Sequence, residues 1–295
     1  MPAPPSSSRL WRAPAKVNLT LHVLGRRADG WHELESVVAF AGCCDWLRFE
    51  PGAPLSLVVD GPTGPSAGPI EDNLVLRAAR ALAERTPGLR TGRFHLRKAL
   101  PVAAGLGGGS ADAAAALRAL AHENGLAADD DRLWAAARAV GADVPACLSS
   151  RARVMAGLGE RLGPALDPPP LFAVLANPGI PVATPQVFAK LGLERGAASG
   201  LGPSPRIDAP VDAARLLAAL RSGRNDLQAS AIAIAPAIAD VLDALSGAEG
   251  ARLARMSGSG ATCFALYDDR RLAARAARAV ARAHPSWWVR ATILR

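Results

Sequence analysis

Aromatic side chains are scarce in this chain: phenylalanine, tryptophan and tyrosine together make up only 4% of its 295 residues. Proteins that bind single-stranded nucleic acid stack bases on such rings, so this scarcity disfavours an extended base-stacking surface. No apolar run approaches the roughly 18 residues that a membrane-spanning helix needs. Residues 1–9 are polar and lack the apolar stretch of a secretory signal. The sequence therefore predicts neither a membrane span nor a cleaved leader.

Cysteine is also rare in the chain. The four thiols have no metal-ligand spacing and indicate no disulfide framework; they are Cys43, Cys44, Cys147 and Cys263. Unpaired thiols are typical of a reducing compartment, so we expect a cytoplasmic protein. Hydrophobic residues, in contrast, make up 50% of the chain, which is enough for a sizeable core, and the length is typical of two domains.

Negative charge is in deficit, because the formal net charge is +8. Four arginines fall on one face of a predicted helix over residues 271–282, opposite a face of alanine, leucine and valine; they are Arg271, Arg275, Arg278 and Arg282. Such a stripe is typical of a solvated helix face, and we favour that interpretation over a nucleic-acid surface. A basic protein also attracts acidic small molecules through its electrostatic field.

Strand and helix patterns alternate along the chain without a strict βαβ rhythm, which favours an α+β fold over a doubly wound sheet. In the clearest strand, residues 16–24, apolar side chains alternate with Lys16, Asn18, Thr20 and His22. Further strands are predicted over residues 31–40, 46–50, 55–59, 93–99, 151–156, 171–176, 252–256, 262–267 and 287–294, and helices over 72–85, 110–123, 130–140, 211–221, 232–245 and 271–282. The proline-rich residues 164–170 separate predicted domains of residues 1–163 and 164–295.

The glycine run of residues 105–110 is the most informative stretch of the chain. Glycines let successive backbone N–H groups turn toward one point, because no Cβ obstructs the conformation or an approaching ligand. Ser110 is a good N-cap for the alanine-rich helix that follows, so the loop and a helix N-terminus would face one spot that suits phosphate. A flexible hinge before an ordinary helix is the alternative. The run lacks a Gly-Lys-Ser/Thr ending and a sixth-position glycine, which excludes a Walker loop and a dinucleotide fingerprint.

Residues 101–110 resemble the phosphate loop of the GHMP kinases, the superfamily of galactokinase, homoserine kinase, mevalonate kinase and phosphomevalonate kinase. Six blocks in order along the chain resemble the branch that phosphorylates a cytidine-diphosphate-linked methylerythritol in the non-mevalonate isoprenoid pathway. The blocks are residues 13–19, 27–32, 98–101, 141–145, 177–179 and 256–260. The resemblance implies an α+β, two-domain GHMP kinase fold with a ribosomal-protein-like N-terminal domain and an α/β-sandwich C-terminal domain.

The resemblance also implies a catalytic pair. Kinases of this fold need a base that takes the proton of the acceptor hydroxyl, and Asp143 matches that base. Lys16 matches the family lysine beside it, whose ammonium would keep the carboxylate ionised and offset developing charge. Asp143 could instead cap the helix at Pro145, and Lys16 could be a solvated residue on the outer face of its strand.

Aromatic contacts to the acceptor are implied as well. Trp31 and His32 match an aromatic residue and a histidine that hold the cytosine, and Phe188 matches the opposing ring. Family members generally have tyrosine where Trp31 stands, so an indole N–H would replace a phenolic hydroxyl. Burial in the core is the alternative for Trp31 and Phe188, and a surface position at a strand end is the alternative for His32.

The other implied acceptor contacts are Asn18, Thr184, Ser257 and Gly258. Asn18 shares a strand face with Lys16 and would bond the erythritol or the cytosine. Thr184 would do likewise, or it would only be the N-cap of a helix with Pro185 at its first position. The turn over residues 257–260 would approach the phosphates or the substrate diphosphate, and a plain β-turn is its alternative.

On the nucleotide side, the resemblance implies that ATP phosphates lie on the amides of the glycine run. The implied ATP-binding residues are Asn73, Lys98, Pro101, Gly105, Leu106, Gly107, Gly108, Gly109 and Ser110. Asn73 and Lys98 match positions near the adenine, with capping or ordinary surface chemistry as alternatives. Mg²⁺ is expected because phosphoryl transfer needs charge neutralisation, and Ser110 is the candidate ligand because residues 130–140 contain no glutamate.

The resemblance therefore implies an ATP-dependent small-molecule kinase of the cytoplasm. Its acceptor would carry a CDP group and be phosphorylated on its 2-hydroxyl, and we expect no nucleic-acid or membrane partner. Two alternatives stay open. One is another kinase of the superfamily, of the homoserine or mevalonate type. The other is a basic RNA-binding protein that reuses the ribosomal-protein-like fold.

Overall fold

The computed structural model describes residues 9–202, 204–207 and 211–295, and the chain forms two compact units. Unit 1 comprises Met1–Ala15, Cys44–Val102 and Gly107–Ser150, and unit 2 comprises Lys16–Cys43, Ala103–Leu106 and Arg151–Arg295. The chain therefore passes between the units within strand β1 (Leu10–Asn18), within strand β3 (His32–Pro51), on both sides of residues 103–106, and between Ser150 and Arg151. The predicted domain boundary at residue 163 stays a prediction.

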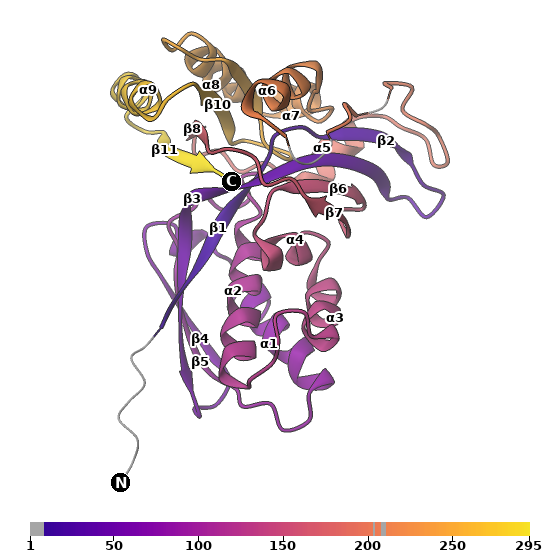
Figure 1. Cartoon of the computed structure of the whole chain (residues 1–295), viewed down its shortest axis with the longest axis vertical. Coiled ribbons are helices and arrows are strands. Elements are labelled where there is room, and N and C mark those ends of the chain that lie inside the picture. The colour runs from indigo at the N-terminus through magenta and orange to yellow at the C-terminus, as the bar shows by residue number, and fades with distance from the viewer. Residues whose placement is uncertain (1–8, 203, 208–210) are drawn as a thin grey trace. The chain divides into compact units, whose positions relative to one another are not determined.

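Unit 1 combines a group of helices with a small sheet. Its further elements are β4 (Ser56–Asp60), η1 (Gly64–Ser66), α1 (Leu74–Arg85), β5 (Gly92–Arg97), α2 (Gly108–Glu123), α3 (Asp131–Val140) and α4 (Val144–Ser149). Strand β5 pairs in parallel with β4 and antiparallel with the C-terminal half of β3, where Trp46 lies opposite Arg97. Helices α1, α2 and α3 lie together beside these strands (Figure 1).

Helix α2 is the central helix of unit 1, and its alanines explain why. Ten of its side chains are buried, among them every residue from Ala111 to Leu117. Small side chains let α1 and α4 pack closely against it. The helix was expected, but its N-cap was predicted wrongly as Ser110. It begins at Gly108, because Gly107 adopts the left-handed conformation (φ 60°) that glycine tolerates best.

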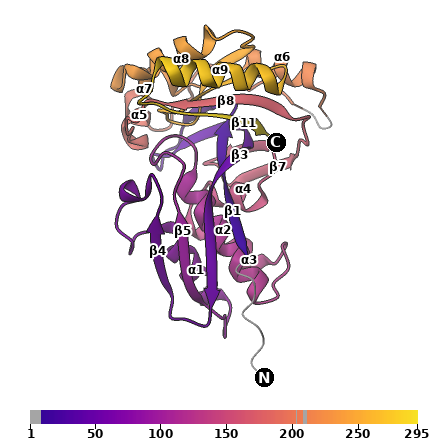
Figure 2. The ribbon, with the colours of Figure 1, turned by 90° about the vertical axis from the view of Figure 1, so that its left-hand side faces the viewer.

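Unit 2 is built on a larger sheet. Its elements are β2 (His22–Arg26), β6 (Arg153–Gly157), β7 (Arg161–Ala165), β8 (Leu171–Asn177), α5 (Thr184–Lys190), α6 (Ala213–Ser222), α7 (Gln228–Ile234), α8 (Ala237–Ser246), β9 (Leu253–Met256), β10 (Cys263–Tyr267), α9 (Arg270–Ala283) and β11 (Trp288–Leu294). The strand order is β3-β11-β8-β10-β9, while β2 and β6 pair with β3 as well. Helices α8 and α9 cover β8 and β10 on one face (Figure 2).

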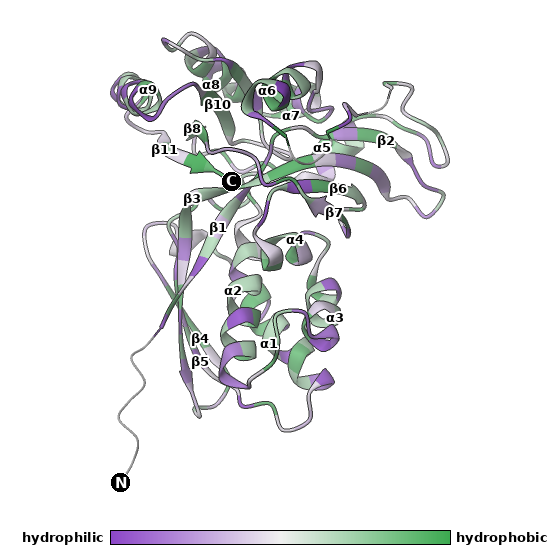
Figure 3. Cartoon of the chain, in the orientation of Figure 1, coloured by the Kyte–Doolittle hydropathy of each residue, from purple (hydrophilic) through white to green (hydrophobic). Residues whose placement is uncertain are grey.

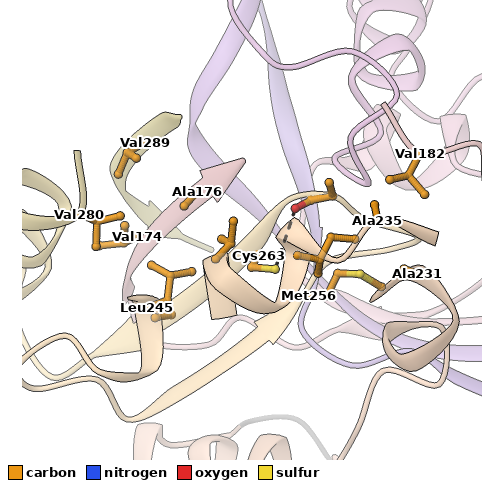
Figure 4. Close-up of a cluster of buried hydrophobic side chains, with 14 of the residues drawn as sticks. Val174, Ala176, Val182, Ala231, Ala235, Leu245, Met256, Cys263, Val280 and Val289 are labelled. Carbon is orange, nitrogen blue, oxygen red and sulfur yellow. Dashed lines mark hydrogen bonds between the residues drawn. The ribbon is translucent and has the colours of Figure 1, made fainter. Parts of the chain in front are cut away.

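The core of unit 2 lies between this sheet and its helices. Figure 4 shows Val174, Ala176 and Cys263 from the strands among Leu245 and Val280 from α8 and α9. All five side chains are buried. Such alternation of small and branched residues fills the layer without voids and fixes the positions of the strand ends.

Helix α9 carries the arginine stripe as predicted. Its buried side chains are Ala273, Ala276, Ala277 and Val280, and Asp269 caps its first turn. Figure 3 shows hydrophilic and hydrophobic stretches alternating around its turns. No described helix is long and apolar enough to cross a membrane.

One predicted interruption is absent from the structure. Two strands were expected over residues 31–40 and 46–50, but β3 runs unbroken from His32 to Pro51. The hydroxyl of Thr292 on β11 accepts hydrogen bonds from the amides of Gly42 and Cys43, at 2.9 and 3.3 Å. A partner distant in sequence therefore satisfies the amides at the expected break.

Candidate active site

Three segments that are far apart in the sequence meet within unit 2. The amide of Lys16 donates to the carbonyl of Leu106 at 2.8 Å, which joins strand β1 to the glycine run. The amide of Asn18 donates to Ser257 Oγ at 3.0 Å, and that hydroxyl donates to the carbonyl of Gly105 at 2.8 Å. The N-terminal strand, the first half of the glycine run and the Gly-Ser turn therefore form one hydrogen-bonded junction.

The Lys16 side chain is buried at this junction. Only 5% of the residue is exposed, so the alternative of a solvated outer-face lysine is wrong. Its Nζ donates to Asn18 Oδ1 at 3.1 Å, and Asn18 Nδ2 donates to Ser36 Oγ at 2.7 Å. Because Asn18 is held from two sides, it fixes the direction in which the ammonium lies.

Two glycines at the junction are required by close backbone contact. Gly105 has a φ of +74°, and a Cβ there would lie 2.1 Å from the carbonyl oxygen of Ser257. Gly258 has a φ of +56°, and a Cβ there would lie 3.0 Å from the carbonyl oxygen of Gly105. The glycine run and the Gly-Ser turn thus lie backbone against backbone, which only residues without a side chain allow.

The Gly-Ser turn is also held from its other sides. Thr184 Oγ1 and Ser259 Oγ lie 2.7 Å apart, and Asn177 Nδ2 donates to Thr262 Oγ1 at 2.9 Å. Asn225 Nδ2 donates to two carbonyls of the turn, a contact that the sequence analysis missed. The capping alternative for Thr184 is wrong, because Thr184 is the first residue of α5 and the N-cap is Ala183.

Of the three ring side chains that were predicted to contact the acceptor, His32 and Phe188 lie together as a pair, and Trp31 is exposed. The rings of His32 and Phe188 lie 4.7 Å apart with an interplanar angle of 31°. Trp31 is 64% exposed, so its alternative of burial in the core is wrong. Burial, followed by the charge of Arg26, lowers the pKa of His32, which favours the neutral ring. Its Nε2 is buried and bonds no described group.

Unit 1 contains a buried charge cluster at the start of the glycine run. Lys98 Nζ lies 2.5 Å from Asp45 Oδ2 and 2.7 Å from Asp112 Oδ2, and all three side chains are almost fully buried. Asp45 Oδ1 accepts hydrogen bonds from the amides of Ala99 and Leu100, at 2.5 and 2.9 Å. The cluster therefore fixes the backbone that leads into the run. Lys98 was predicted as an adenine contact, and both carboxylates escaped notice in the sequence.

Burial and charge act in opposite directions on this cluster. Burial alone would lower the pKa of Lys98, but the charges of Asp112 and Asp45 raise it above its ordinary value. Burial raises the pKa of Asp112 to about 7, although the charge of Lys98 opposes the shift. Asp112 Oδ1 is buried and has no hydrogen-bond partner among the described residues, which agrees with a carboxyl that binds a proton readily.

The other predicted residues of unit 1 lie at helix ends. Asn73 caps α1, because its side chain accepts a hydrogen bond from Val75 N at 3.0 Å. Asp143 occupies the N-cap position of α4, but its side chain makes no capping hydrogen bond, so the capping alternative is wrong. Ser110 lies in the first turn of α2. Within the described residues, no cluster of three or more histidine, cysteine or carboxylate side chains could hold a metal ion.

Comparison with known families shows which family the chain belongs to. The sequence profile of the GHMP kinases N terminal domain matches residues 73–151, and that of the GHMP kinases C terminal region matches residues 211–286. The chain belongs to the GHMP kinases. The expected GHMP kinase fold is thereby confirmed, and the protein is an ATP-dependent small-molecule kinase.

Individual relatives cover nearly the whole chain. A 4-diphosphocytidyl-2-C-methyl-D-erythritol kinase of Methylobacterium radiotolerans is 61% identical over 285 residues, which covers 96% of this chain and 98% of the relative. The enzyme of the same name from Xanthobacter autotrophicus is 58% identical over 288 residues, with the same coverage. The nucleic-acid alternative and the homoserine and mevalonate alternatives are not favoured by these matches.

Solved structures agree with this family membership. A crystal structure of a 4-(cytidine 5'-diphospho)-2C-methyl-D-erythritol kinase aligns with a TM-score of 0.76 at 38% identity, covering 97% of this chain and 99% of the other. A homoserine kinase from Cytophaga hutchinsonii aligns with a TM-score of 0.62 at 18% identity, covering 97% and 94%. The second likeness shows a shared fold.

Gly105→Ala should destabilise the enzyme by about 3 kcal/mol, because the new Cβ overlaps the Ser257 carbonyl and the positive φ is strained. Gly108→Ala is the matched control, since its Cβ would come no closer than 3.5 Å to Lys98 Nζ. Thermal unfolding of both variants measures the difference. Equal midpoints would contradict the close backbone contact.

Asp112→Asn should remove part of the enzyme's pH dependence. The pKa of Asp112 is about 7 in the folded state against 3.8 ordinarily, so the folded state binds the proton more tightly than the unfolded state. The contribution of Asp112 to the free energy of unfolding therefore falls as pH rises from about 4 to about 7. The variant cannot ionise there and should lose less stability over that range. Calorimetric midpoints at several pH values test this, and parallel curves for the two proteins would refute it.

Proposed function

We propose that this kinase transfers the γ-phosphoryl group of ATP to the 2-hydroxyl of 4-diphosphocytidyl-2-C-methyl-D-erythritol in the cytoplasm. The junction at which Ser257 joins Asn18 to Gly105 carries the proposal. It joins the three segments on which the resemblance depends: the lysine strand, the phosphate loop and the Gly-Ser turn. Relatives named for this acceptor, at up to 61% identity, support the same substrate.

The glycine run suits the phosphates of ATP. The first intrahelical bond of α2 runs from Ala111 N to Gly107 O at 2.9 Å, so the amides of Gly108, Gly109 and Ser110 have no acceptor within the helix. Unpaired amides and the helix dipole at this end both favour an anion. Leu106 and Pro101, on either side of Gly105, complete the loop. In this proposal the glycine run binds the phosphates of ATP.

Asp143 and Lys16 divide the proton and charge chemistry. Asp143 takes the proton of the acceptor hydroxyl as the oxygen attacks the γ-phosphorus and the bond to the β-phosphate oxygen breaks. Lys16 stabilises the charge that develops on the transferred group. A lysine held by Asn18 in a buried position is suited to this role, since little reorganisation is needed when charge develops.

Mg²⁺ would be held by few protein groups. The Ser110 hydroxyl, in the first turn of α2, is the side chain that fits a Mg²⁺ ligand, because the ion binds oxygen and retains several waters alongside phosphate oxygens. When bound, the ion neutralises charge on the phosphates. The chain itself supplies the amides and the two charged side chains described above.

The acceptor's base would be held at the His32–Phe188 pair. A neutral His32 offers one ring donor and one ring acceptor to a cytosine edge, and its buried Nε2 is a polar atom without a described partner. The exposed indole of Trp31 is adjacent in the chain and can stack on the other face of the base. Asn18, Thr184, Ser257 and Gly258 complete the proposed acceptor contacts.

The adenine side involves Asn73 and Lys98. Two carboxylates hold Lys98 Nζ, and the Lys98 amide donates to Asp60 O at 2.9 Å. Lys98 would therefore offer the base its carbonyl oxygen, which accepts only a long bond from Thr63 N at 3.4 Å. Asn73 uses its Oδ1 to cap α1, which leaves its Nδ2 donors for the nucleotide.

Acceptor specificity tests the proposed substrate directly. In a coupled assay for ADP release, kcat/KM for 4-diphosphocytidyl-2-C-methyl-D-erythritol should exceed that for homoserine or mevalonate by at least about 10³-fold, because buried polar groups reject acceptors that leave them unpaired. Comparable rates with either smaller acceptor would overturn the proposed substrate while leaving the kinase assignment intact.

Asp143→Asn should lower kcat by about 10³-fold, because the amide cannot accept the hydroxyl proton. Asp130→Asn is the matched control: it removes a carboxylate at the N-cap of α3, where asparagine caps equally well. Affinity for an unreactive ATP analogue, measured by calorimetry, should be unchanged in both variants. Near-normal turnover of Asp143→Asn would show that another group is the base.

A further inference from the structure

The short connection between helices α6 and α7, residues 223–227, holds both sides of the junction in unit 2. On one side it pairs with the corner between β1 and β2, and on the other it bonds the Gly-Ser turn. Neither the glycine run nor the phosphate-binding motifs include this connection.

Its contacts to the β1–β2 corner involve backbone and one carboxylate. Leu21 N donates to Arg224 O at 2.8 Å, and Asp226 N donates to Leu21 O at 2.9 Å. Asp226 Oδ2 accepts from Val23 N at 2.7 Å, while its Oδ1 accepts from Arg224 Nε at 2.6 Å. The Asp226 side chain is 2% exposed, so these bonds are shielded from water.

Its contacts to the turn centre on Asn225, which is also buried. Asn225 Nδ2 donates to the carbonyls of Met256 and Gly258, at 2.8 and 2.9 Å. Asn225 Oδ1 accepts from Leu227 N at 3.0 Å, which fixes the amide's orientation. One side-chain amide therefore holds the carbonyls on both sides of Ser257.

Ser257 is the residue whose hydroxyl joins Asn18 to Gly105. Its own main chain is flanked by the two carbonyls that Asn225 fixes, so a shift of the turn would move that hydroxyl from both partners. The Lys16 ammonium depends in turn on Asn18. A continuous series of hydrogen bonds thus leads from Asn225 to the lysine and to the glycine run.

We propose that Asn225 is a positioning residue of the kinase: it sets the Gly-Ser turn so that Ser257 can align the Lys16 strand with the phosphate loop. The proposal rests on the proposed roles of Lys16 and of the loop. Asparagine suits this position because its amide supplies two donor hydrogens and one acceptor, whereas aspartate of the same shape supplies acceptors alone.

Asn225→Asp is the decisive substitution. It keeps the acceptor for Leu227 N but sets a carboxylate against two carbonyl oxygens that cannot donate. Asn177→Asp is the matched control: Asn177 is also buried, donates through its Nδ2 to a residue just after the turn, and accepts from Gly179 N as Asn225 accepts from Leu227 N. Its partner there is the Thr262 hydroxyl, which can rotate and donate to the new carboxylate.

The wild-type enzyme is first shown to be active on 4-diphosphocytidyl-2-C-methyl-D-erythritol. The kcat of Asn225→Asp, measured per folded enzyme, should then be at least about tenfold lower than that of the wild type, because the reacting groups are no longer aligned. The KM for ATP should change by less than about threefold. Asn177→Asp should keep kcat within about twofold. Asn225→Ala, which loses the donors without adding charge, should show a smaller loss in the same parameter. It also provides the test if the aspartate variant does not fold.

A pH profile separates positioning from a general loss of stability. When the carboxyl introduced by Asn225→Asp is protonated, it can donate to one of the two carbonyls, so the ratio of variant to wild-type kcat should rise as the pH falls from about 8 to about 6. A normal kcat in both Asn225 variants, or an equal loss in Asn177→Asp, would overturn the proposal. Absence of activity in the wild type with this acceptor would instead refute the proposed substrate.

Discussion

The candidate site of unit 2 depends on the two hydrogen bonds that the hydroxyl of Ser257 makes. A hydroxyl can accept and donate at once, and here it accepts from the Asn18 amide and donates to the Gly105 carbonyl. Its three neighbouring segments come from residues more than 80 positions apart in the chain, so no local propensity could hold them together. Gly105 and Gly258 lack a Cβ, and this allows the two backbones to come close enough for the hydrogen bonds of this hydroxyl.

The backbone before the glycine run and the first residues of the run are held by different physical means. Its entry is fixed by charge, since Asp45 holds the amides of Ala99 and Leu100 while pairing with Lys98. Its first two residues, Gly105 and Leu106, are fixed by neutral hydrogen bonds from the Ser257 hydroxyl and the amide of Lys16. Removing charged groups from water costs free energy, so the Lys98 cluster contributes little net stability. Its main effect is to hold the backbone before the run in a single arrangement.

The sequence was sufficient for the parts of the fold that depend on local pattern. Alanine content predicted α2, and the arginine period predicted α9, because both patterns follow from helix geometry. Resemblance supplied Lys16, Asn18 and Ser257, and the structure brings those three together. Their roles in catalysis and binding stay predictions, as does the pairing of Lys16 with Asp143.

Residues whose importance depends on distant partners could not be found in this way. Asp45 lies in a strand and Asp112 in an alanine-rich helix, where each looks like an ordinary polar residue until Lys98 lies between them. Asn225 gives no signal either, because its two carbonyl partners are about thirty residues away. The continuous β3 was missed for the same reason: its central amides bond Thr292.

Each unit is built from several separate segments of the chain, and this affects how the protein can fold during translation. Every piece of unit 1 has been translated once Ser150 is added, so its helices can pack while the ribosome is still working. The sheet of unit 2 must wait for β11, whose strand separates β3 from β8 and ends at Leu294. Until then its early strands have unpaired edges, and nascent chains are exposed to aggregation at that stage. Chaperone demand should therefore come chiefly from strand β8, which pairs with β11 over its whole length, Leu171–Asn177, and waits for that partner until the end of translation.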